Sequence, residues 1–597
     1  MTGLATEPDV EADLDENQVA LDGKTGPGVR IKTEATLAEA IVDVLASQGV
    51  ELAFGVSGGA VALIFDALVE SPRIELHHFR HETGAAFAAA EAYFATKKPT
   101  VVFTTTGPGT LNALTGITAA RWEGAKVVLV SGCTSAAQRG RWATQETSPY
   151  TMPQDSLYSQ GSIFDLAVRL ESAAEFPEVA RRLALGLSRP GRFIAHLCLP
   201  MGLQAGRIDL PAKTPAARMS PPAVSCEEAE VCARRLKTGS FAVWVGFGAS
   251  ESGPLVRELV ERTGAKIFCS PRGKGIVSED HPQFLGVTGL GGHDAVNEYM
   301  TLQKPDWVLV LGTRLGEATS YWDLDMVPRK GFIHVDIDPE VPGTAYPEAT
   351  TLGIHSEIGC FLRVLMKLLP AKATPMMPDF VRRSAIPTLL MTPERGPVRP
   401  QVLMQAVQRQ VVQGSDALVL AECGNSFAWA NHYLRFSGPA RYRVSMLFGS
   451  MGHTAAGVVG AALARRGKAV AIVGDGAMLM NSEISTAVQY GAPAVWIVLN
   501  DAGYGMCRDG HFALGLTEKE VGIPRVDFVA LARSVGAEGA RVRTEGEIEG
   551  AVDAALQTSG PFVIDVDVDT NESSPLLRRF ESLIQQGNSK NVSGWEA

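Results

Sequence analysis

Two aspartates near the carboxyl end of the chain, Asp475 and Asp501, have the side-chain type and the setting of metal ligands. Asp475 stands in a Gly-Asp-Gly turn after the apolar run 469–473, and Asp501 follows a second apolar run, 494–499. We predict that these runs are parallel strands, joined by a right-handed crossover through a helix over 481–490. Both aspartates would then lie past the carboxyl ends of strands, where doubly wound sheets bind their ligands. Carboxylates beside a glycine turn suit Mg2+ held jointly by the protein and a diphosphate.

A glutamate that could exchange a proton lies far upstream, at Glu82 in the segment 80–86, Arg-His-Glu-Thr-Gly-Ala-Ala. A strand-like run over 74–79 precedes it, and an alanine-rich helix is predicted to follow. The same block holds two glycine-rich segments, 54–60 and 106–112. By itself, a glutamate at a helix start more often only accepts hydrogen bonds from free backbone N–H groups. The functional interpretation therefore depends on finding all these segments, and the aspartate pair, in one chain.

Together, in this order and at this spacing, the segments resemble the thiamine diphosphate (ThDP) enzymes of the acetolactate-synthase-like (pyruvate oxidase/decarboxylase) superfamily. The resemblance covers nearly the whole chain and implies an α/β fold of three doubly wound parallel-sheet domains. The alternation of strand-like and helical runs indicates the same fold class. The predicted divisions are an acidic flexible extension at 1–33, a pyrimidine-binding domain at 34–200, a Rossmann-like middle domain at 226–369, a diphosphate-binding domain at 401–570 and a tail at 571–597, with proline-rich linkers on both sides of the middle domain.

The resemblance assigns the metal ion, Mg2+, to Asp475, Asp501 and the backbone carbonyl of Gly503. Asp501 stands where the family usually has an asparagine, so this chain keeps an oxygen ligand and adds a negative charge. That change leaves the preference between Mg2+ and Mn2+ open. In that family the glutamate of the Arg-His-Glu segment contacts N1′ of the cofactor's aminopyrimidine, which makes Glu82 a predicted catalytic residue.

Further cofactor contacts are implied by the resemblance at glycine turns, small polar residues and one large apolar residue. Met451, between glycines, is the predicted wedge that holds ThDP in its bent shape. Outside a cofactor site, a methionine usually fills a gap in a core. The predicted cofactor-binding set is Gly58, Gly59, Glu82, Gly424, Asn425, Ser426, Gly449, Ser450, Met451, Gly474, Asp475, Gly476, Ala477, Asp501, Tyr504, Gly505 and Met506.

The predicted substrate wall and the middle domain both depart from acetolactate synthases. Gln145 is retained from a segment that those enzymes place near the reacting centre, so it is the second predicted catalytic residue, but the neighbouring phenylalanine is Thr144 here. In the middle domain, Arg314 keeps the first arginine of the family's flavin-binding segment, and the second is lost. Weak nucleotide-type turns remain, including 246–248 and 289–293. We therefore expect ThDP and Mg2+ as cofactors and favour a middle domain without FAD, with bound FAD as the open alternative.

The function implied is that of a ThDP-dependent lyase or transferase that forms carbon–carbon bonds. It would decarboxylate a 2-keto acid such as pyruvate and add the acyl anion to a carbonyl acceptor. A decarboxylase, or a hydrolase or oxidase that cleaves a diketone without ligation, is the alternative. A nicotinamide dehydrogenase is disfavoured because no GxGxxG segment is followed by the required acidic residue. A non-catalytic subunit with this fold is disfavoured because Glu82 and the aspartate pair are all present.

Charge and composition restrict the partners. The net charge of −11 argues against a nucleic acid or an anionic membrane surface. No apolar run is long enough to cross a bilayer. Eight scattered cysteines without a CxxC pair are typical of a reducing compartment, so a cytoplasmic location is expected. Because the resemblance places Glu82 and Asp475 on different subunits of each active site, we expect a homodimer or homotetramer with shared sites.

Overall fold

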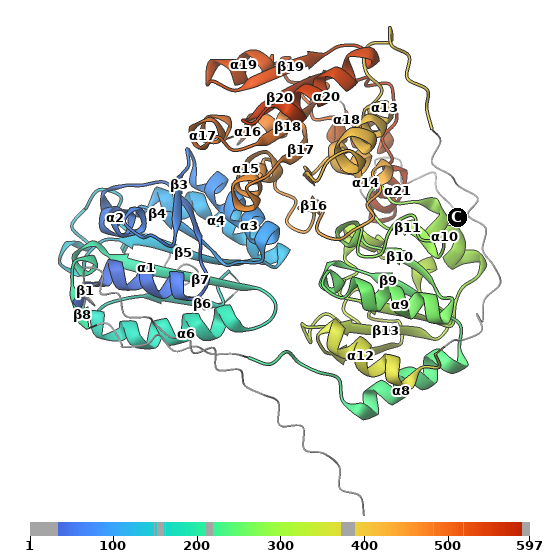
Figure 1. The fold of residues 1–597 in the computed structure, drawn as a ribbon, viewed down its shortest axis with the longest axis horizontal. Helices are drawn as coiled ribbons and strands as arrows, with labels where there is room; N and C mark the ends of the chain where they lie inside the picture. The colour runs from blue at the N-terminus through green and yellow to red at the C-terminus, as the bar shows by residue number, and fades with distance from the viewer. Residues whose placement is uncertain are drawn as a thin grey trace, which may run out of the picture.

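The structure, a computed structural model, describes residues 34–148, 150–151, 160–161, 163–209, 219–371, 388–480, 483–517 and 519–587. The predicted extension at 1–33 lies outside these residues, as do 210–218 and 372–387 of the predicted linkers and 588–597 of the predicted tail. Three six-stranded sheets, each entirely parallel, form three separate lobes (Figure 1). The predicted fold of three doubly wound domains is confirmed. No helix within the described ranges is long and apolar enough to span a membrane.

The first domain contains a sheet in the order β3-β2-β4-β5-β7-β6 with helices on both faces. Its strands and helices are α1 (Leu37–Ser47), β2 (Leu52–Gly55), α2 (Ala62–Val69), β3 (Glu75–His78), α3 (Glu82–Thr96), β4 (Thr100–Thr104), α4 (Pro108–Glu123), β5 (Lys126–Cys133), β6 (Leu166–Arg169), α6 (Phe176–Ser188) and β7 (Phe193–Pro200). Strands β4, β5 and β7 are buried along their length except at Lys126, which is why they appear as mostly apolar runs in the sequence.

The first domain also continues past the boundary predicted at residue 200. Helix α7 (Met201–Gln204) follows β7 directly, and β8 (Arg207–Asp209) then pairs antiparallel with β1 (Glu34–Thr36). The buried side chain of Gln204 donates to the carbonyl of Ala60 at 2.7 Å, which fixes this return to the domain. Three-residue strands carry too little periodicity to be distinguished from a linker in the sequence.

The middle domain has the strand order β11-β10-β9-β12-β13-β14, which is the Rossmann arrangement. Its elements are α8 (Cys226–Thr238), β9 (Phe241–Val245), α9 (Gly253–Thr263), β10 (Lys266–Cys269), β11 (Phe284–Val287), α10 (Asp294–Leu302), β12 (Trp307–Leu311), α11 (Glu317–Ser320), β13 (Gly331–Asp336), β14 (Thr351–His355) and α12 (Ile358–Leu368).

The third domain has the order β16-β15-β17-β18-β20-β19, which repeats the order of the first sheet when each is counted from its own first strand. The first and third domains therefore share one plan. The elements are α13 (Pro400–Val407), β15 (Leu418–Ala421), α14 (Asn425–Tyr433), β16 (Tyr442–Val444), α15 (His453–Arg465), β17 (Ala469–Gly474), α16 (Asp475–Met480), α17 (Ile484–Tyr490), β18 (Ala494–Asn500), α18 (Gly505–Ala513), α19 (Phe528–Ser534), β19 (Glu538–Val542), α20 (Ile548–Gln557), β20 (Phe562–Asp567) and α21 (Leu577–Gln585).

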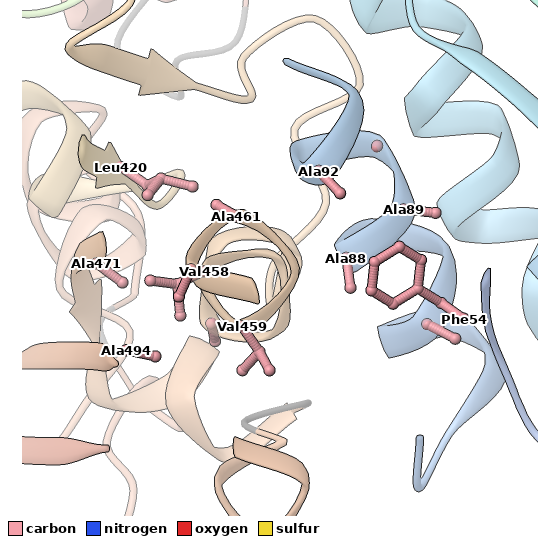
Figure 2. Packing of buried hydrophobic residues seen from close by; sticks show 14 of the residues in the cluster. Phe54, Ala88, Ala89, Ala92, Leu420, Val458, Val459, Ala461, Ala471 and Ala494 are labelled. Atoms are coloured by element: carbon pink, nitrogen blue, oxygen red, sulfur yellow. The ribbon is translucent and has the colours of Figure 1, made fainter. Parts of the chain in front are cut away.

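Helices α3 and α15 join the first and third domains through faces of small residues. Figure 2 shows α3 and α15 side by side, with Ala88 and Ala92 on the side of α3 toward α15; these alanines and Val459 of α15 are buried. The backbones approach so closely that a Cβ added to the glycine at position 460 would lie 2.2 Å from the carbonyl oxygen of residue 88. Small side chains thus set the relative position of the two domains that carry the predicted site residues.

A buried ion cluster lies beside this helix pair. Arg443 donates to both carboxylate oxygens of Glu91 at 3.0 and 2.9 Å, and His453 Nε2 lies 2.9 Å from the same carboxylate. Burial alone would raise the pKa of Glu91, but Arg443 and His453 outweigh it and hold that pKa well below its ordinary value. The first domain is thereby held to the third by a charge pair as well as by apolar packing.

The Glu91→Gln variant is expected to lose about 3–5 kcal/mol of unfolding free energy, because it leaves the buried Arg443 unpaired. The folded-state pKa of Glu91 is depressed, so its contribution is present above the ordinary value of 4.5 and is lost as the pH falls. In urea titrations, the unfolding free energy of the variant should therefore be lower than that of the wild-type protein at pH 7, and this difference should shrink toward pH 3. Glu178→Gln, in an exposed pair with Arg181, is the matched control and should be neutral. A variant as stable as wild type at pH 7 would contradict this role.

Candidate active site

Asp475 and Asp501 lie at one edge of the third sheet. Strands β17 and β18 are adjacent and parallel, Asp475 follows β17 directly as the first residue of α16, and Asp501 follows β18. The carboxylate of Asp475 is buried and accepts from the backbone N–H of Gly476 at 2.7 Å and of Gly503 at 3.2 Å. The expected strand, helix, strand order is present, with α17 beginning at Ile484; residues 481–482 of the predicted helix lie outside the described part.

The two carboxylates form an electronegative site. Burial, and then the charge of Asp501, raise the pKa of Asp475 to about 7. Burial also raises the pKa of Asp501, against the opposing effect of Arg508, whose Nη2 lies 2.8 Å from Asp501 Oδ2. Arg508 thus pairs with Asp501, the pKa of both largely buried carboxyl groups stays raised, and a cation is their natural complement. No cluster of three or more metal-ligating side chains occurs in the described ranges, so a metal here would need backbone and ligand oxygens as well.

A cavity of about 260 Å³ opens beside these aspartates. Gly424, with φ +98°, and Gly474 both line it, and a Cβ added to either would meet no heavy atom within 4 Å. Their backbones therefore face open space, as a diphosphate cradle requires. Of the predicted cofactor and metal residues in this domain, the cavity is lined by Gly424, Asn425, Ser426, Gly449, Met451, Gly474, Asp475, Gly476, Ala477, Asp501, Gly503, Tyr504, Gly505 and Met506. Ser450 is the one that does not line it.

An apolar wall stands over the Gly-Asp-Gly turn. A Cβ added to Gly476 would lie 2.7 Å from the ring of Tyr504 and 3.5 Å from the methyl group of Met451. Glycine is therefore required at this position by the close approach of the tyrosine ring. Met451 lies at the cavity wall, the place that a wedge under a bent cofactor needs.

Several residues around this cavity were not expected from the sequence. Arg508 and Asp509 come from the first turns of α18, and Asp509 Oδ2 accepts from Asn425 at 3.0 Å and from Ser574 at 3.0 Å. Trp429, Cys423, Cys507 and the segment 568–572 also line the cavity. The one signal in the sequence for the contact of Arg508 with Asp501 is the spacing between them. That spacing becomes informative only when the start of α18 is known.

The other predicted catalytic residue lies on the first domain. Glu82 begins α3 and is 8% exposed, and its Oε2 accepts from the side-chain amide of Asn112 at 3.1 Å. A Cβ at Gly109 would lie 3.0 Å from Glu82 Oε1, so glycine leaves room at that oxygen. A Cβ at Gly58 would meet the side chain of Thr105, which also packs beside Gly109. The three sequence segments of this domain therefore meet around Glu82.

A residue of the third domain fixes the backbone that leads to Glu82. The buried carboxylate of Glu483 accepts from the backbone N–H groups of Arg80 and His81, each at 3.1 Å. Burial raises the pKa of Glu483, and these N–H groups and Thr486 oppose that shift. Nothing in the sequence around Glu483 indicated this contact, because it joins residues about four hundred positions apart.

Gln145 lies against the same edge of the first domain. Its backbone carbonyl accepts from Thr106 Oγ1 at 3.2 Å, and a Cβ at Gly107 would lie 3.0 Å from that carbonyl oxygen. Its own φ is +54° and its side chain is exposed. Gln145 thus adjoins the glycine loop that packs on Glu82, but no described hydrogen bond joins the two side chains.

The two groups of predicted residues do not share a cavity within one chain. In the part of the chain that the structure describes, every residue around the Asp475 cavity falls between Pro400 and Glu572. Glu82, Gln145, Gly58 and Gly59 are not among them. The predicted site residues therefore fall into two groups, one on the first domain and one on the third.

The glycine turns of the middle domain serve backbone packing. A Cβ at Gly289 would lie 2.1 Å from the carbonyl of Ala318, and one at Gly291 would lie 2.5 Å from that of Ala428. Gly248 packs in the same way against the backbone of Gly312. A cavity of about 440 Å³ does lie beside Arg314, whose guanidinium donates to the carbonyl of residue 122 at 3.0 Å. The expectation of a middle domain without FAD stays a prediction.

Comparison with known proteins decides the family. Residues 35–152, 237–365 and 422–566 match the family models of the thiamine pyrophosphate enzymes for the N-terminal TPP binding domain, the central domain and the C-terminal TPP binding domain. The chain belongs to the thiamine pyrophosphate enzyme family. The three matches fall on the three domains of the structure, and the first and third contain Glu82 and Asp475, respectively.

Curated relatives of this thiamine pyrophosphate enzyme include several acetolactate synthases. The chain is 27% identical over 549 residues to the acetolactate synthase isozyme 2 large subunit of Escherichia coli, covering 90% of this chain and 96% of that protein. It is 28% identical over 567 residues to a probable acetolactate synthase large subunit of Methanocaldococcus jannaschii, with 90% and 93% covered. A putative acetolactate synthase large subunit, IlvB2, of Mycobacterium tuberculosis is 29% identical over 569 residues, with 90% and 99% covered.

The third-domain cavity fits the cofactor that the family name implies. Gly424 and Gly474 present backbone that no side chain covers, and Asn425 Oδ1 is a buried acceptor without a hydrogen-bond partner among the described atoms. The aspartate pair supplies anionic ligands for a divalent ion that a diphosphate would share. The donor set thus suits thiamine diphosphate with a metal ion.

The Asp501→Asn variant, which restores the residue usual in this family, is expected to bind ThDP with Mg2+ within about tenfold of the wild-type affinity. An amide oxygen can still ligate the metal, and Arg508, freed from its 2.8 Å contact with Asp501, becomes available to the diphosphate. Quenching of Trp429, which lines the cavity, provides the titration signal. A loss of ThDP binding as large as the one that we expect for Asp475→Asn would show that Asp501 has a different role.

Proposed function

We propose that this thiamine pyrophosphate enzyme is a carboligase that decarboxylates a 2-keto acid such as pyruvate and adds the acyl group to a carbonyl acceptor. The relatives named acetolactate synthases, aligned over about 90% of the chain, support this choice of reaction. The observation that carries the proposal is the buried carboxyl of Glu82, present in the same chain as the Asp475 and Asp501 cavity. A chain that had lost catalysis would have no reason to keep both.

The proposed cofactors are ThDP and Mg2+. When bound, ThDP supplies the electron sink that allows a bond beside a carbonyl carbon to break or form. Asp475, Asp501 and the carbonyl of Gly503 would hold Mg2+, and the uncovered backbone at Gly424 and Gly474 would receive the diphosphate. Met451 would support the bend between the two rings of the cofactor.

Glu82 is proposed to hold a proton at N1′ of the aminopyrimidine. Its Oε2 is occupied by Asn112, while Oε1 faces the space that Gly109 leaves open. One oxygen is thus fixed and the other is available to the cofactor, which orients the carboxyl group for proton transfer. Gln145, exposed at the same edge, is proposed to contact the substrate. Beside it, Thr144 has a smaller side chain than the phenylalanine that acetolactate synthases have in this wall of the pocket.

A homodimer or homotetramer is proposed, in which each active site uses Glu82 from one subunit and Asp475 from another. The two groups of predicted site residues do not share a cavity in one chain, and exposed apolar side chains flank both: Leu111 and Trp142 on the first domain, and Met480 at the end of α16. Exposed apolar groups of this kind mark surfaces that a partner covers. Eight free cysteines, none in a disulfide, support the cytoplasm as the proposed location.

Sedimentation of the active enzyme should give at least twice the mass of one chain, and dilution below the dimer affinity should abolish turnover. The physical reason is that a separated chain lacks half of each active site. Activity and sedimentation should be measured on the same dilution series. Full specific activity in fractions of single-chain mass would contradict the shared site.

The test of the proposed reaction is incubation of the purified protein with pyruvate, Mg2+ and ThDP, with product identification and CO2 measurement. Acetolactate or a mixed acyloin, with ThDP-dependent CO2 release, is the expected result. Acetaldehyde as the sole product would favour simple decarboxylation. Intact pyruvate, with ThDP bound, would overturn pyruvate as the donor and direct the search to diketones or longer keto acids.

A further inference from the structure

Two of the eight cysteines line the Asp475 cavity, from separate parts of the third domain. Cys423 lies in the turn between β15 and α14, and Cys507 lies near the start of α18. Cys423 is partly buried and Cys507 is exposed. None of the other six cysteines borders this cavity. The site described above gives neither thiol a role.

The segments that carry the two thiols are in direct contact. Asn425, two residues after Cys423, donates from its side chain to Asp509, two residues after Cys507, at 3.0 Å. A Cβ added to Gly505 would lie 3.0 Å from the same amide nitrogen. The turn before α14 and the first turn of α18 are therefore held against each other at the cavity, with one cysteine on each.

The environments of the two sulfurs differ. Burial, and next the charge of Glu422, raise the pKa of the Cys423 thiol well above its ordinary value, and Cys507 is near enough to add to that shift. Cys423 is therefore a protonated, protected thiol, while the exposed Cys507 is the one that solutes reach first.

We propose that Cys423 and Cys507 form a dithiol at the cofactor pocket, and that its oxidation to a disulfide excludes ThDP. The proposal rests on the proposed ThDP site. The oxidant is a low-molecular-weight disulfide such as oxidised glutathione. The Cys507 thiolate attacks one sulfur of that disulfide and releases a first thiol; the Cys423 sulfur, giving its proton to solvent, then attacks Cys507 and releases a second. Two protein thiols become one disulfide, and one small disulfide becomes two thiols.

Exclusion of ThDP follows from what the bridge would join. A disulfide holds its two Cα atoms about 4.4–6.8 Å apart. It would tie the turn containing Gly424 to the start of α18, and both of these segments surround the space for the diphosphate. Because coupling between two binding events is reciprocal, bound ThDP must disfavour the disulfide to the same extent that the disulfide disfavours ThDP.

The test treats the metal-free, cofactor-free wild-type protein with oxidised glutathione and maps its disulfides by peptide mass spectrometry. The expected result is a bridge between Cys423 and Cys507, prevented by prior addition of ThDP and Mg2+, and a loss of ThDP affinity by about tenfold or more that a reductant reverses. A glutathione adduct on Cys507 without the bridge, or a bridge with unchanged ThDP affinity, would overturn the proposal.

Cysteine variants provide the controls. Cys507→Ser should abolish both the bridge and the effect of oxidised glutathione on ThDP binding, whereas Cys226→Ser, which removes an exposed thiol on α8, should leave both as in wild type. Retention of the affinity loss in Cys507→Ser would also overturn the proposal. The disulfide map of the wild-type protein remains a valid test even if Cys507→Ser fails to fold. If the reduced protein does not bind ThDP at all, the proposed function fails, and the bridge is judged by mapping alone.

Discussion

The Glu82→Gln variant is expected to bind ThDP and Mg2+ almost as tightly as the wild-type enzyme and to lose about 10²–10⁴-fold in turnover. Glutamine keeps the size of the side chain and an oxygen that can accept from Asn112, as Glu82 Oε2 does at 3.1 Å. It cannot hold and return a proton at N1′ of the aminopyrimidine. The loss should therefore appear in turnover rather than in cofactor binding.

The measurement for Glu82 does not depend on knowing the substrate. The C2 proton of bound ThDP exchanges with D2O, and NMR of acid-quenched samples gives the rate. Glu82→Gln should slow this exchange strongly, while Glu230→Gln, at an exposed position of α8, should leave it unchanged. Exchange at the wild-type rate in Glu82→Gln would remove Glu82 from the mechanism.

Asp475→Asn is expected to weaken the joint binding of Mg2+ and ThDP by about 100-fold or more, since loss of one partner of a buried charge contact costs about 2–5 kcal/mol. The buried carboxylate accepts from the backbone N–H groups of Gly476 and Gly503, which fix its position beside the cavity. Isothermal titration of the apo protein with ThDP at saturating Mg2+ measures the effect.

A binding defect in Asp475→Asn must be distinguished from misfolding. Burial raises the pKa of Asp475 to about 7, which means that the metal-free fold disfavours the ionised carboxylate. The apo variant should therefore be at least as stable to heat as the apo wild-type protein at pH 8. Asp416→Asn, whose side chain is 88% exposed, should bind ThDP normally. Tight ThDP binding by Asp475→Asn would show that the metal lies elsewhere.

Elements with a strong local pattern could be predicted from the sequence. The run 469–473 became β17, and the helix expected after residue 82 became α3, because buried parallel strands and an alanine-rich helix each leave a clear signature. The Gly-Asp-Gly turn was placed correctly after its strand, but the reason for glycine at 476, the nearby ring of Tyr504, comes from the structure.

Contacts between distant segments could not be predicted. Glu483 fixes the backbone before Glu82 from another domain, and Arg508 faces Asp501 because of where α18 begins. Neither contact leaves a periodic or compositional signal, since each depends on the packing of whole domains or on one helix start. The expected linker after residue 200 proved to contain β8 for the same reason: its partner, β1, lies at the other end of the first domain.

The shared active site is tested by cofactor C2-proton exchange in a mixed dimer of Glu82→Gln and Asp475→Asn chains, purified through two different affinity tags. If each site joins Glu82 of one subunit to Asp475 of the other, one of the two sites in the mixed dimer is fully wild type. That site alone binds ThDP tightly, and its C2 proton should exchange at the wild-type rate. If instead both residues of a site came from one chain, ThDP would bind only in the Glu82→Gln chain, beside the substituted glutamine, and slow exchange in the mixed dimer would contradict the account.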